Sequence, residues 1–175
     1  MTAQQTSVAT MGKTFAGLLS DLAPKYVRSY QNESATELPF GVAVKLGSDP
    51  DKYVAVPTAQ ASVIHGVSVH SHAYAKPTEL GDTGLKQYVT VGVLRWGVIN
   101  VYCSEQVVVG TSGVRIRIDT NAGSDALLGP GTFCVSSSAG HTILVTSGMK
   151  WLRGCAAQGF AELEVNMSSF AKTND

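Results

Sequence analysis

The stretch Ala161-Glu162-Leu163-Glu164-Val165-Asn166-Met167 alternates strictly between apolar and polar side chains. Successive side chains of a β-strand point to opposite faces of its sheet, so this period of two is typical of a strand with one buried face. The run Val114-Arg115-Ile116-Arg117-Ile118 repeats the pattern, and we expect its two arginines to face solvent. Both stretches predict a half-buried sheet.

The stretch around Trp96 breaks this alternation. From Val89 to Val93 every second residue is apolar, but the apolar positions then move to Leu94, Trp96 and Val98. Because a shift of one residue moves side chains to the other face of a sheet, the pattern predicts a β-bulge or tight turn near residues 95–97.

Further runs have the composition of strands: residues 41–46, 53–56, 64–70, 106–109, 132–136 and 142–146. Turn residues separate them at short spacing, at 47–51, 81–84, 121–123, 129–131 and 139–141. About nine short strands punctuated in this way predict an all-β chain, a single antiparallel β-sandwich or closed barrel, with a jelly roll among the topologies that it allows.

The N-terminal segment differs from the rest of the chain. Its first dozen residues are polar and rich in Thr, Gln, Ser and Ala, so they have little means of folding alone. The one candidate helix is short, from Thr14 to Leu22, and Pro24 ends it. We therefore predict an extended N-terminal arm over residues 1–23 and a single β domain over residues 24–175.

The composition excludes several classes of protein. The chain has 175 residues with 13 Lys and Arg against 13 Asp and Glu, so it lacks the basic excess with which proteins bind nucleic acids or anionic membranes. No apolar run approaches the ~18 residues of a membrane span, and the opening residues lack the cations of a secretory signal. We expect synthesis in the cytoplasm. Charged residues make up only 15% of the chain, against about 25% in an average soluble protein. So few charges favour a surface that is covered by other molecules when the protein functions.

His70 and His72 are the sharpest candidates for metal ligands. Histidines two residues apart on a strand share a face and could hold zinc, iron or nickel, as in cupin-like metalloenzymes. The glutamate that would follow in a cupin is displaced here to Glu79, beyond Pro77. The alternative is a pair of histidines that bond the backbone at a strand end, and we predict no metal and no cofactor.

No other pattern predicts catalysis. Cys103, Cys134 and Cys155 form no C-x-x-C pair, and their positions predict inert, largely buried thiols. The chain has neither a G-x-S-x-G elbow nor a P-loop. Glu162 and Glu164 are expected on the outer face of their strand, solvated or in contact with a neighbour. We therefore predict that the protein is not an enzyme.

Large apolar and aromatic side chains are the candidates for an interface. Trp96 and Trp151 could anchor a partner, since Trp is enriched in interfaces, or could be ordinary core aromatics. The full set of interface candidates is Phe15, Leu18, Leu19, Tyr74, Trp96 and Trp151.

Five motifs recur in the same order in a known family. They are Pro39-Phe40-Gly41-Val42-Ala43-Val44, residues 66–74 (GVSVHSHAY), residues 81–86 (GDTGLK), residues 91–99 (VGVLRWGVI) and residues 160–167 (FAELEVNM). In this order they resemble the structural cement, or head decoration, proteins of tailed bacteriophages. The resemblance extends from about Phe15 to Met167.

The resemblance implies a non-enzymatic virion component. Such a protein binds the outer surface of the capsid and ties neighbouring major capsid subunits together; related decoration proteins often form trimers, and dimers also occur. The implied partners are the major capsid protein and further copies of this chain, with no nucleic acid or membrane, and residues 1 to about 23 would reach across the capsid. The alternatives are a phage tail or receptor-binding component on a similar β body and, less favoured, a cupin-like metalloenzyme using His70 and His72.

Overall fold

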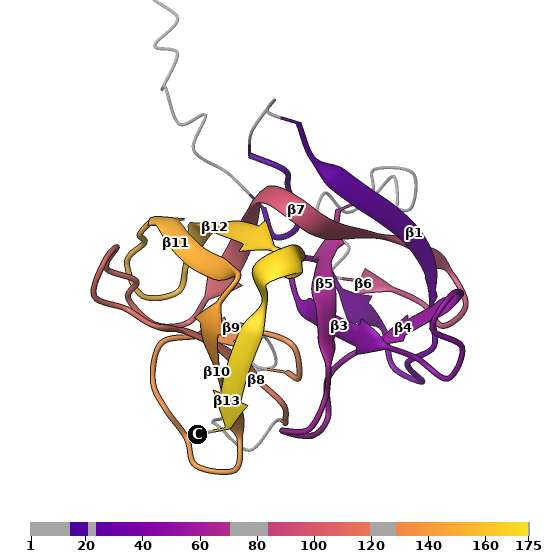
Figure 1. Cartoon of the computed structure of the whole chain (residues 1–175). Coiled ribbons are helices and arrows are strands. Elements are labelled where there is room, and N and C mark those ends of the chain that lie inside the picture. Colours follow the sequence, from indigo (N-terminus) through magenta and orange to yellow (C-terminus); the bar gives the residue numbers. More distant parts are fainter. Residues whose placement is uncertain (1–14, 21–23, 71–83, 120–128, 175) are drawn as a thin grey trace, which may run out of the picture.

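The computed structural model describes residues 15–20, 24–70, 84–119 and 129–174, which form strands, turns and one short 3-10 helix but no α-helix. None of the helices in these ranges is long and apolar enough to cross a membrane. The elements are β1 (Tyr26–Asn32), β2 (Leu38–Pro39), β3 (Ala43–Leu46), β4 (Tyr53–Ala55), β5 (Ile64–Val69), β6 (Gly84–Leu85), β7 (Thr90–Cys103), β8 (Val114–Arg117), β9 (Phe133–Cys134), β10 (Thr142–Ser147), β11 (Met149–Arg153), β12 (Gly159–Asn166), η3 (Met167–Ser169) and β13 (Ala171–Asn174) (Figure 1). The predicted all-β class is confirmed.

Five of the strands close into a ring. The sheet runs in the order β1-β4-β3-β5-β7, and β7 pairs again with β1, so the path returns to its start. The prediction of a sandwich or closed barrel is confirmed. Most pairings are antiparallel as expected, but β1 pairs with β4 in parallel and so does β7 with β9.

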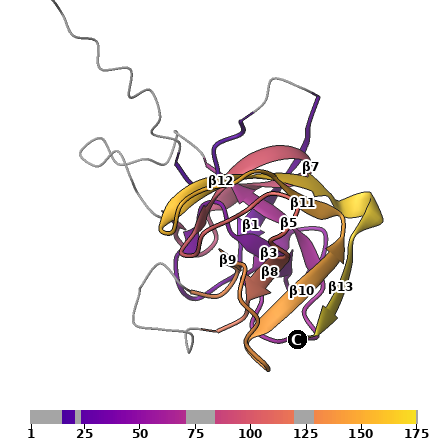
Figure 2. The ribbon, with the colours of Figure 1, turned by 90° about the vertical axis from the view of Figure 1, so that its left-hand side faces the viewer.

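The long strand β7 joins this ring to the second half of the molecule. Beyond the ring the sheet continues from β7 through β9, β8 and β10 to β13, while β12 pairs with β7 along eight positions and carries β11 on its other edge. Seen from the side, β11 and β12 arch above β8, β9 and β10 (Figure 2). A single strand therefore supports both halves.

The molecule has two apolar cores, and the larger one also includes residues of the ring strand β5. One cluster includes Tyr30, Phe40, Val54 and Val91, from β1, β3, β4 and β7 and the chain between them. The larger cluster combines β5, the rest of β7 and β8–β12. It includes all three apolar residues that alternate along β12: Ala161, Leu163 and Val165 are completely buried. The alternation that predicted this strand therefore comes from its position over the larger core.

The predicted irregularity in β7 is a β-bulge. Tyr26 pairs with Trp96 and Val27 with Leu94, so Arg95 is an extra residue on β7. Gly97 follows with a φ of 134°, a backbone conformation that L side chains rarely adopt. The β-bulge predicted near residues 95–97 is confirmed.

The shift of the apolar positions to Leu94, Trp96 and Val98 does not continue along β7. Trp96 is exposed, and the completely buried residues that follow are Ile99, Val101 and Cys103. The parity therefore changes only locally and then returns, because the bulge turns Arg95 and Trp96 outward before β7 rejoins the core.

Two further predictions of local structure were wrong. The run 106–109 forms only an isolated bridge between Val107 and Cys155. The candidate helix over 14–22 is absent from residues 15–20, where Gly17 has a φ of 81° and Leu19 bridges Ile99. Apart from one turn hydrogen bond, from the N–H of Leu18 to the carbonyl oxygen of Phe15, the backbone groups there bond mainly to β7, so this segment lies along the strand rather than forming a helix. The turn at 121–123 and much of the turn at 81–84 lie outside the described residues.

Candidate functional site

The candidate ligand His70 lies just after β5 and is packed between two aromatic rings. The centroid of its ring is 4.5 Å from that of Phe15 and 4.6 Å from that of Phe40. Its backbone N–H donates to the carbonyl oxygen of Gly17 at 2.9 Å. His72 lies outside the described residues, and no three His, Cys, Asp or Glu within the described ranges are placed to hold a metal. The observed surroundings of His70 are those of a packing residue.

The three cysteines are free thiols in surroundings that favour the protonated form. Burial raises the pKa of Cys103 to about 11 and that of Cys134 to about 12. Burial also raises the pKa of the half-buried Cys155. Because the thiolate is the reactive species, none of these groups is suited to act as a nucleophile at neutral pH.

The prediction that both arginines of β8 face solvent was wrong for Arg117. Its side chain is 7% exposed, and its Nη2 lies 3.0 Å from Oε1 of Glu105. The other carboxylate oxygen accepts the backbone N–H groups of Val135 and Ser136 at 2.9 and 2.6 Å. Burial alone would raise the pKa of Glu105, but these N–H donors and the guanidinium of Arg117 lower it overall. The cluster joins β8 and the segment after β9 to the loop after β7, which is a structural role.

The apolar N-terminal candidates lie against β7. Residues Gly17 and Leu18 exchange backbone hydrogen bonds with Asn100: the N–H of Gly17 donates to its carbonyl oxygen, and the N–H of Asn100 donates to the Leu18 carbonyl oxygen, both at 2.8 Å. Leu19 is partly buried against the larger core. The structure therefore brings Phe15, Leu18 and Leu19 onto the β body as a strap over β7, defined here as residues 15–20.

The two tryptophans have opposite surroundings. Trp151 is 4% exposed, and its indole Nε1 donates to the carbonyl oxygen of Gly113 at 3.2 Å, so it is a core aromatic. Trp96 is 45% exposed. Tyr74 lies outside the described residues. Trp151 is therefore a core aromatic, whereas the exposed side chain of Trp96 could be covered by a partner.

A groove borders the exposed face of Trp96. Its lining residues come from β1, β7, β12 and η3: Tyr26, Arg95, Trp96, Asn166, Met167 and Ser168. Tyr26 is 53% exposed and pairs with Trp96 across the bulge, so two large aromatic side chains lie open together. We call these six residues the aromatic groove.

Sequence reasoning found only Trp96 of this groove. Tyr26 and Arg95 were missed because neither belongs to a clean alternating run. The signal that could have found Tyr26 is the spacing of Tyr26, Arg28 and Tyr30, which places large side chains at every second position of a strand.

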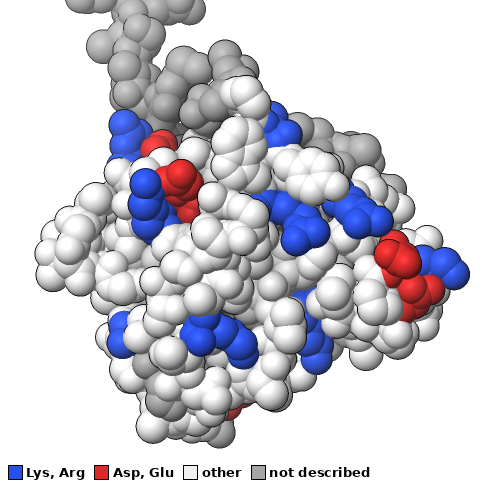
Figure 3. Space-filling view, in the orientation of Figure 1, with Lys and Arg blue, Asp and Glu red and all other residues white. Residues whose placement is uncertain are grey.

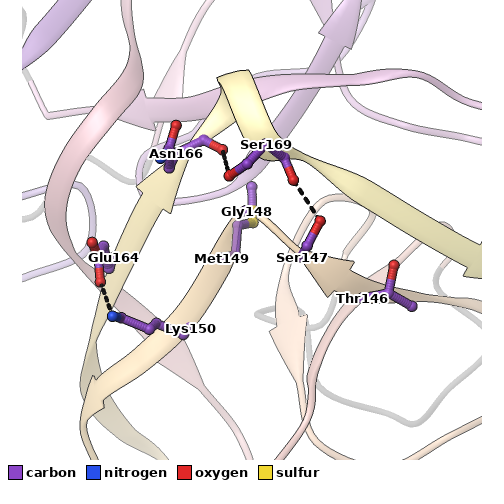
Figure 4. Close-up of a pocket in the computed structure, with 8 residues that line it drawn as sticks. All are labelled: Thr146, Ser147, Gly148, Met149, Lys150, Glu164, Asn166 and Ser169. Atoms are coloured by element: carbon purple, nitrogen blue, oxygen red, sulfur yellow. Dashed lines mark hydrogen bonds and ion pairs between the residues drawn. The ribbon is translucent and has the colours of Figure 1, made fainter.

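A second pocket lies between β10, β11, β12 and η3 (Figure 4). Its polar groups mostly bond to each other: Nζ of Lys150 lies 2.8 Å from Oε2 of Glu164, and the hydroxyl of Ser169 donates to the carbonyl oxygen of Asn166 at 3.3 Å. The hydroxyl of Ser147 donates in turn to the carbonyl oxygen of Ser169. These partners leave few groups directed at a ligand.

The outward carboxylates of β12 face cations of β11. Glu162 lies 3.5 Å from Arg153, as Glu164 lies beside Lys150. Both lie on the outer face of the strand, as expected, and both contribute to pairing within the chain.

Comparison with known proteins gives one family. The sequence model of the family described as structural cement protein (E217 gp24/Pam3 gp6) matches residues 3–166. Among solved structures, a chain from the capsid of Myoviridae phage XM1 superposes with a TM-score of 0.62 and 14% sequence identity, over 87% of this chain and 90% of that chain. At this identity the likeness shows a shared fold. No curated protein matches the sequence.

Proposed function

This chain belongs to the family of phage structural cement proteins, and on that premise we propose that it binds the outer surface of a phage head and ties neighbouring major capsid subunits together. The observation that carries the proposal is the family match over residues 3–166. The fold shared with a chain of the phage XM1 capsid supports it.

The described surface also supports a binding role. A protein that holds other subunits together needs a rigid body and exposed side chains that a partner can desolvate. The two cores and the ring closed by β7 provide the rigid body. Tyr26 and Trp96 provide the exposed side chains. We propose that the protein catalyses no reaction: in the described ranges burial raises the pKa of its thiols, and its carboxylate Glu105 is held in an ion pair with the buried Arg117.

We extend the proposal to the N-terminal arm, residues 1–23. Residues 15–20 form the strap over β7, which supports a role for them as the anchor of the arm. Residues 1–14 would then reach a neighbouring capsid subunit, while residues 24–175 form the β domain.

We further propose that the protein acts as a homotrimer, with a dimer as the alternative. Once one copy of an oligomer is docked, the others bind at an effective concentration that can be millimolar, so avidity exceeds single-site affinity by roughly 10²–10⁴. Sedimentation velocity of the purified chain gives the number of copies directly.

The decisive experiment is co-sedimentation of the purified protein with phage heads that lack it, followed by electron microscopy of the decorated particles. We expect saturable binding, with density on the outside of the head. A protein that is found on the tail of intact virions instead would support the receptor-binding alternative. Deletion of residues 1–14 should weaken head binding while leaving the unfolding transition of the β domain in place.

A further inference from the structure

The bulge at Arg95 places three unlike side chains at the aromatic groove. Because Arg95 is the extra residue, it and Trp96 are both turned out of the core, and Trp96 lies opposite Tyr26. Aromatic side chains that stay half exposed keep apolar surface in contact with water, which a partner would remove. The groove therefore combines two apolar rings with a guanidinium group.

Arg95 is the one charged residue among the six described residues that line this groove. Within the described part of the chain, Arg95 forms no ion pair. Arg28, on β1, lies 5.5 Å above the ring of Tyr30 and forms an ion pair of 4.0 Å with Asp51, whose side chain is 89% exposed. Figure 3 shows blue side chains in the region of β1 and the adjoining part of β7, with red ones at the far right and also at the upper left, in the region of β11 and β12.

The charges of Arg95 and Arg28 both act on His65. Its Nε2 lies 2.7 Å from the hydroxyl oxygen of Tyr30, behind the two arginines. Burial first, and then the charges of Arg95 and Arg28, lower the pKa of His65 to about 4. The imidazole is therefore neutral at neutral pH.

We propose that the aromatic groove receives a segment of a capsid subunit in which a carboxylate side chain lies next to an apolar one. The carboxylate would bind Arg95, whose planar guanidinium can donate two parallel hydrogen bonds, and the apolar side chain would cover Trp96 and Tyr26. This proposal rests on the proposed function and names the chemistry of the partner.

A second copy of this chain is a poor occupant of the groove. Its described carboxylates are largely engaged within the chain: Glu162 and Glu164 face cations of β11, Glu105 faces Arg117, and Asp119 faces His141. Each such pair would have to break before its carboxylate could bind Arg95 of a neighbour. Charge complementarity therefore favours a different protein.

Nucleic acid is also disfavoured as the occupant. A phosphate backbone is bound by an extended row of cations, and affinity grows with the number of phosphates that are neutralised. Arg95 is the one charged residue among the six that line the groove, on a chain whose net charge is zero. One guanidinium group is better matched by a single carboxylate than by a row of phosphates.

The test compares head binding of wild type, Arg95→Glu, Trp96→Ala and a control, Lys86→Glu. Lys86 is exposed, lies outside the groove, and its reversal changes the net charge by the same amount as Arg95→Glu. We expect Arg95→Glu and Trp96→Ala each to weaken binding by about tenfold or more, and Lys86→Glu to change it by less than about twofold. Trp96→Phe should restore part of the affinity, and unfolding midpoints should show that all variants are folded.

Competition identifies the chemistry of the occupant. Poly-L-glutamate should displace the wild-type protein from heads, and single-stranded DNA of matched length should do so far less. The proposal is overturned if Arg95→Glu binds like wild type, if Lys86→Glu weakens binding equally, or if DNA is the better competitor. Wild-type protein that does not bind heads at all would instead overturn the proposed function, and this inference with it.

Discussion

Glu105 and Arg117 form an ion pair of 3.0 Å between the loop after β7 and the end of β8, with the arginine side chain almost completely buried. A buried guanidinium is tolerated only beside a hydrogen-bonded anion, because its removal from water is unfavourable. The pair also fixes the chain after β9, whose backbone N–H groups at Val135 and Ser136 bind the same carboxylate. Three segments of the second half thus depend on one carboxyl group.

We predict that Glu105→Ala lowers the free energy of unfolding by about 3 kcal/mol, since it leaves Arg117 buried without its counter-ion. Lys150→Ala is the matched control, because it breaks the exposed pair with Glu164 and should change stability by only about 0.5 kcal/mol. Urea denaturation of the two variants measures the difference. Equal losses would show that the buried pair contributes no more than the exposed one.

Acid should remove the contribution of Glu105. Its pKa is lower in the folded protein than the ordinary value of 4.5, so the unfolded chain binds the proton more readily. The stabilisation is therefore complete above pH 4.5 and is lost as the pH falls through the lower, folded pKa. Stability measured against pH should fall less steeply in this acid range for Glu105→Gln than for wild type.

His65 should give a separate pH dependence at higher pH. Its pKa of about 4 in the folded protein lies below the ordinary value of 6.5, so between these values the unfolded chain binds more protons. Stability should therefore rise with pH from about 4 to 6.5, the values that bound the shift. His65→Gln should flatten the profile in this window. An unchanged slope would mean that His65 titrates alike in both states.

Gly17 should be required for the strap over β7. A Cβ at this position would lie 2.7 Å from the backbone nitrogen of His70, and φ is 81°. We predict that Gly17→Ala costs about 2 kcal/mol or releases the strap. Gly140→Ala is the control, with the same φ but nothing within 4 Å, and should cost about 1 kcal/mol.

Hydrogen exchange separates the two outcomes for Gly17→Ala. The amide of Asn100, which donates to the Leu18 carbonyl oxygen, should lose protection if the strap detaches. The amides of β12 should keep theirs.

The two tryptophans should respond oppositely to truncation. Trp151→Ala should lower the free energy of unfolding by about 3–5 kcal/mol, because it opens a cavity beside Phe133 in the larger core. Trp96→Ala should leave stability nearly unchanged, because its side chain is half exposed. Thermal unfolding followed by circular dichroism compares them, and a similar loss in both would contradict the assignment of Trp96 to an interface.

The sequence predicted strands well where one face is buried along a regular path. In β12, every second side chain is buried in the larger core, so apolar and polar residues alternate in its sequence. In β1 the pattern fails, because Tyr26 to Ser29 are all exposed and only Tyr30 and Asn32 are buried. The burial pattern does not distinguish such a strand from a loop; its pairing with β7 and β4 defines it.

The site was harder to predict than the fold because it depends on contacts distant in sequence. Arg117 has the alternation of a solvent-facing residue, and only the carboxylate of Glu105, brought in by the loop after β7, allows its burial. The bulge was visible as a change of parity, yet its consequence, Tyr26 beside Trp96, required the pairing with β1. Trp96 and Trp151 could not be separated from composition alone.

The arrangement of β7 has a mechanical consequence. A pull on the N-terminal segment acts first on the strap, whose hydrogen bonds to Asn100 and to the backbone of His70 join it to β7 and to the end of β5. β7 is also held along its length by β1, β5 and β12, so the load spreads as shear over many ladder bonds rather than peeling one edge. Because β7 contributes to both cores, a force applied at one end of this strand is distributed over both of them.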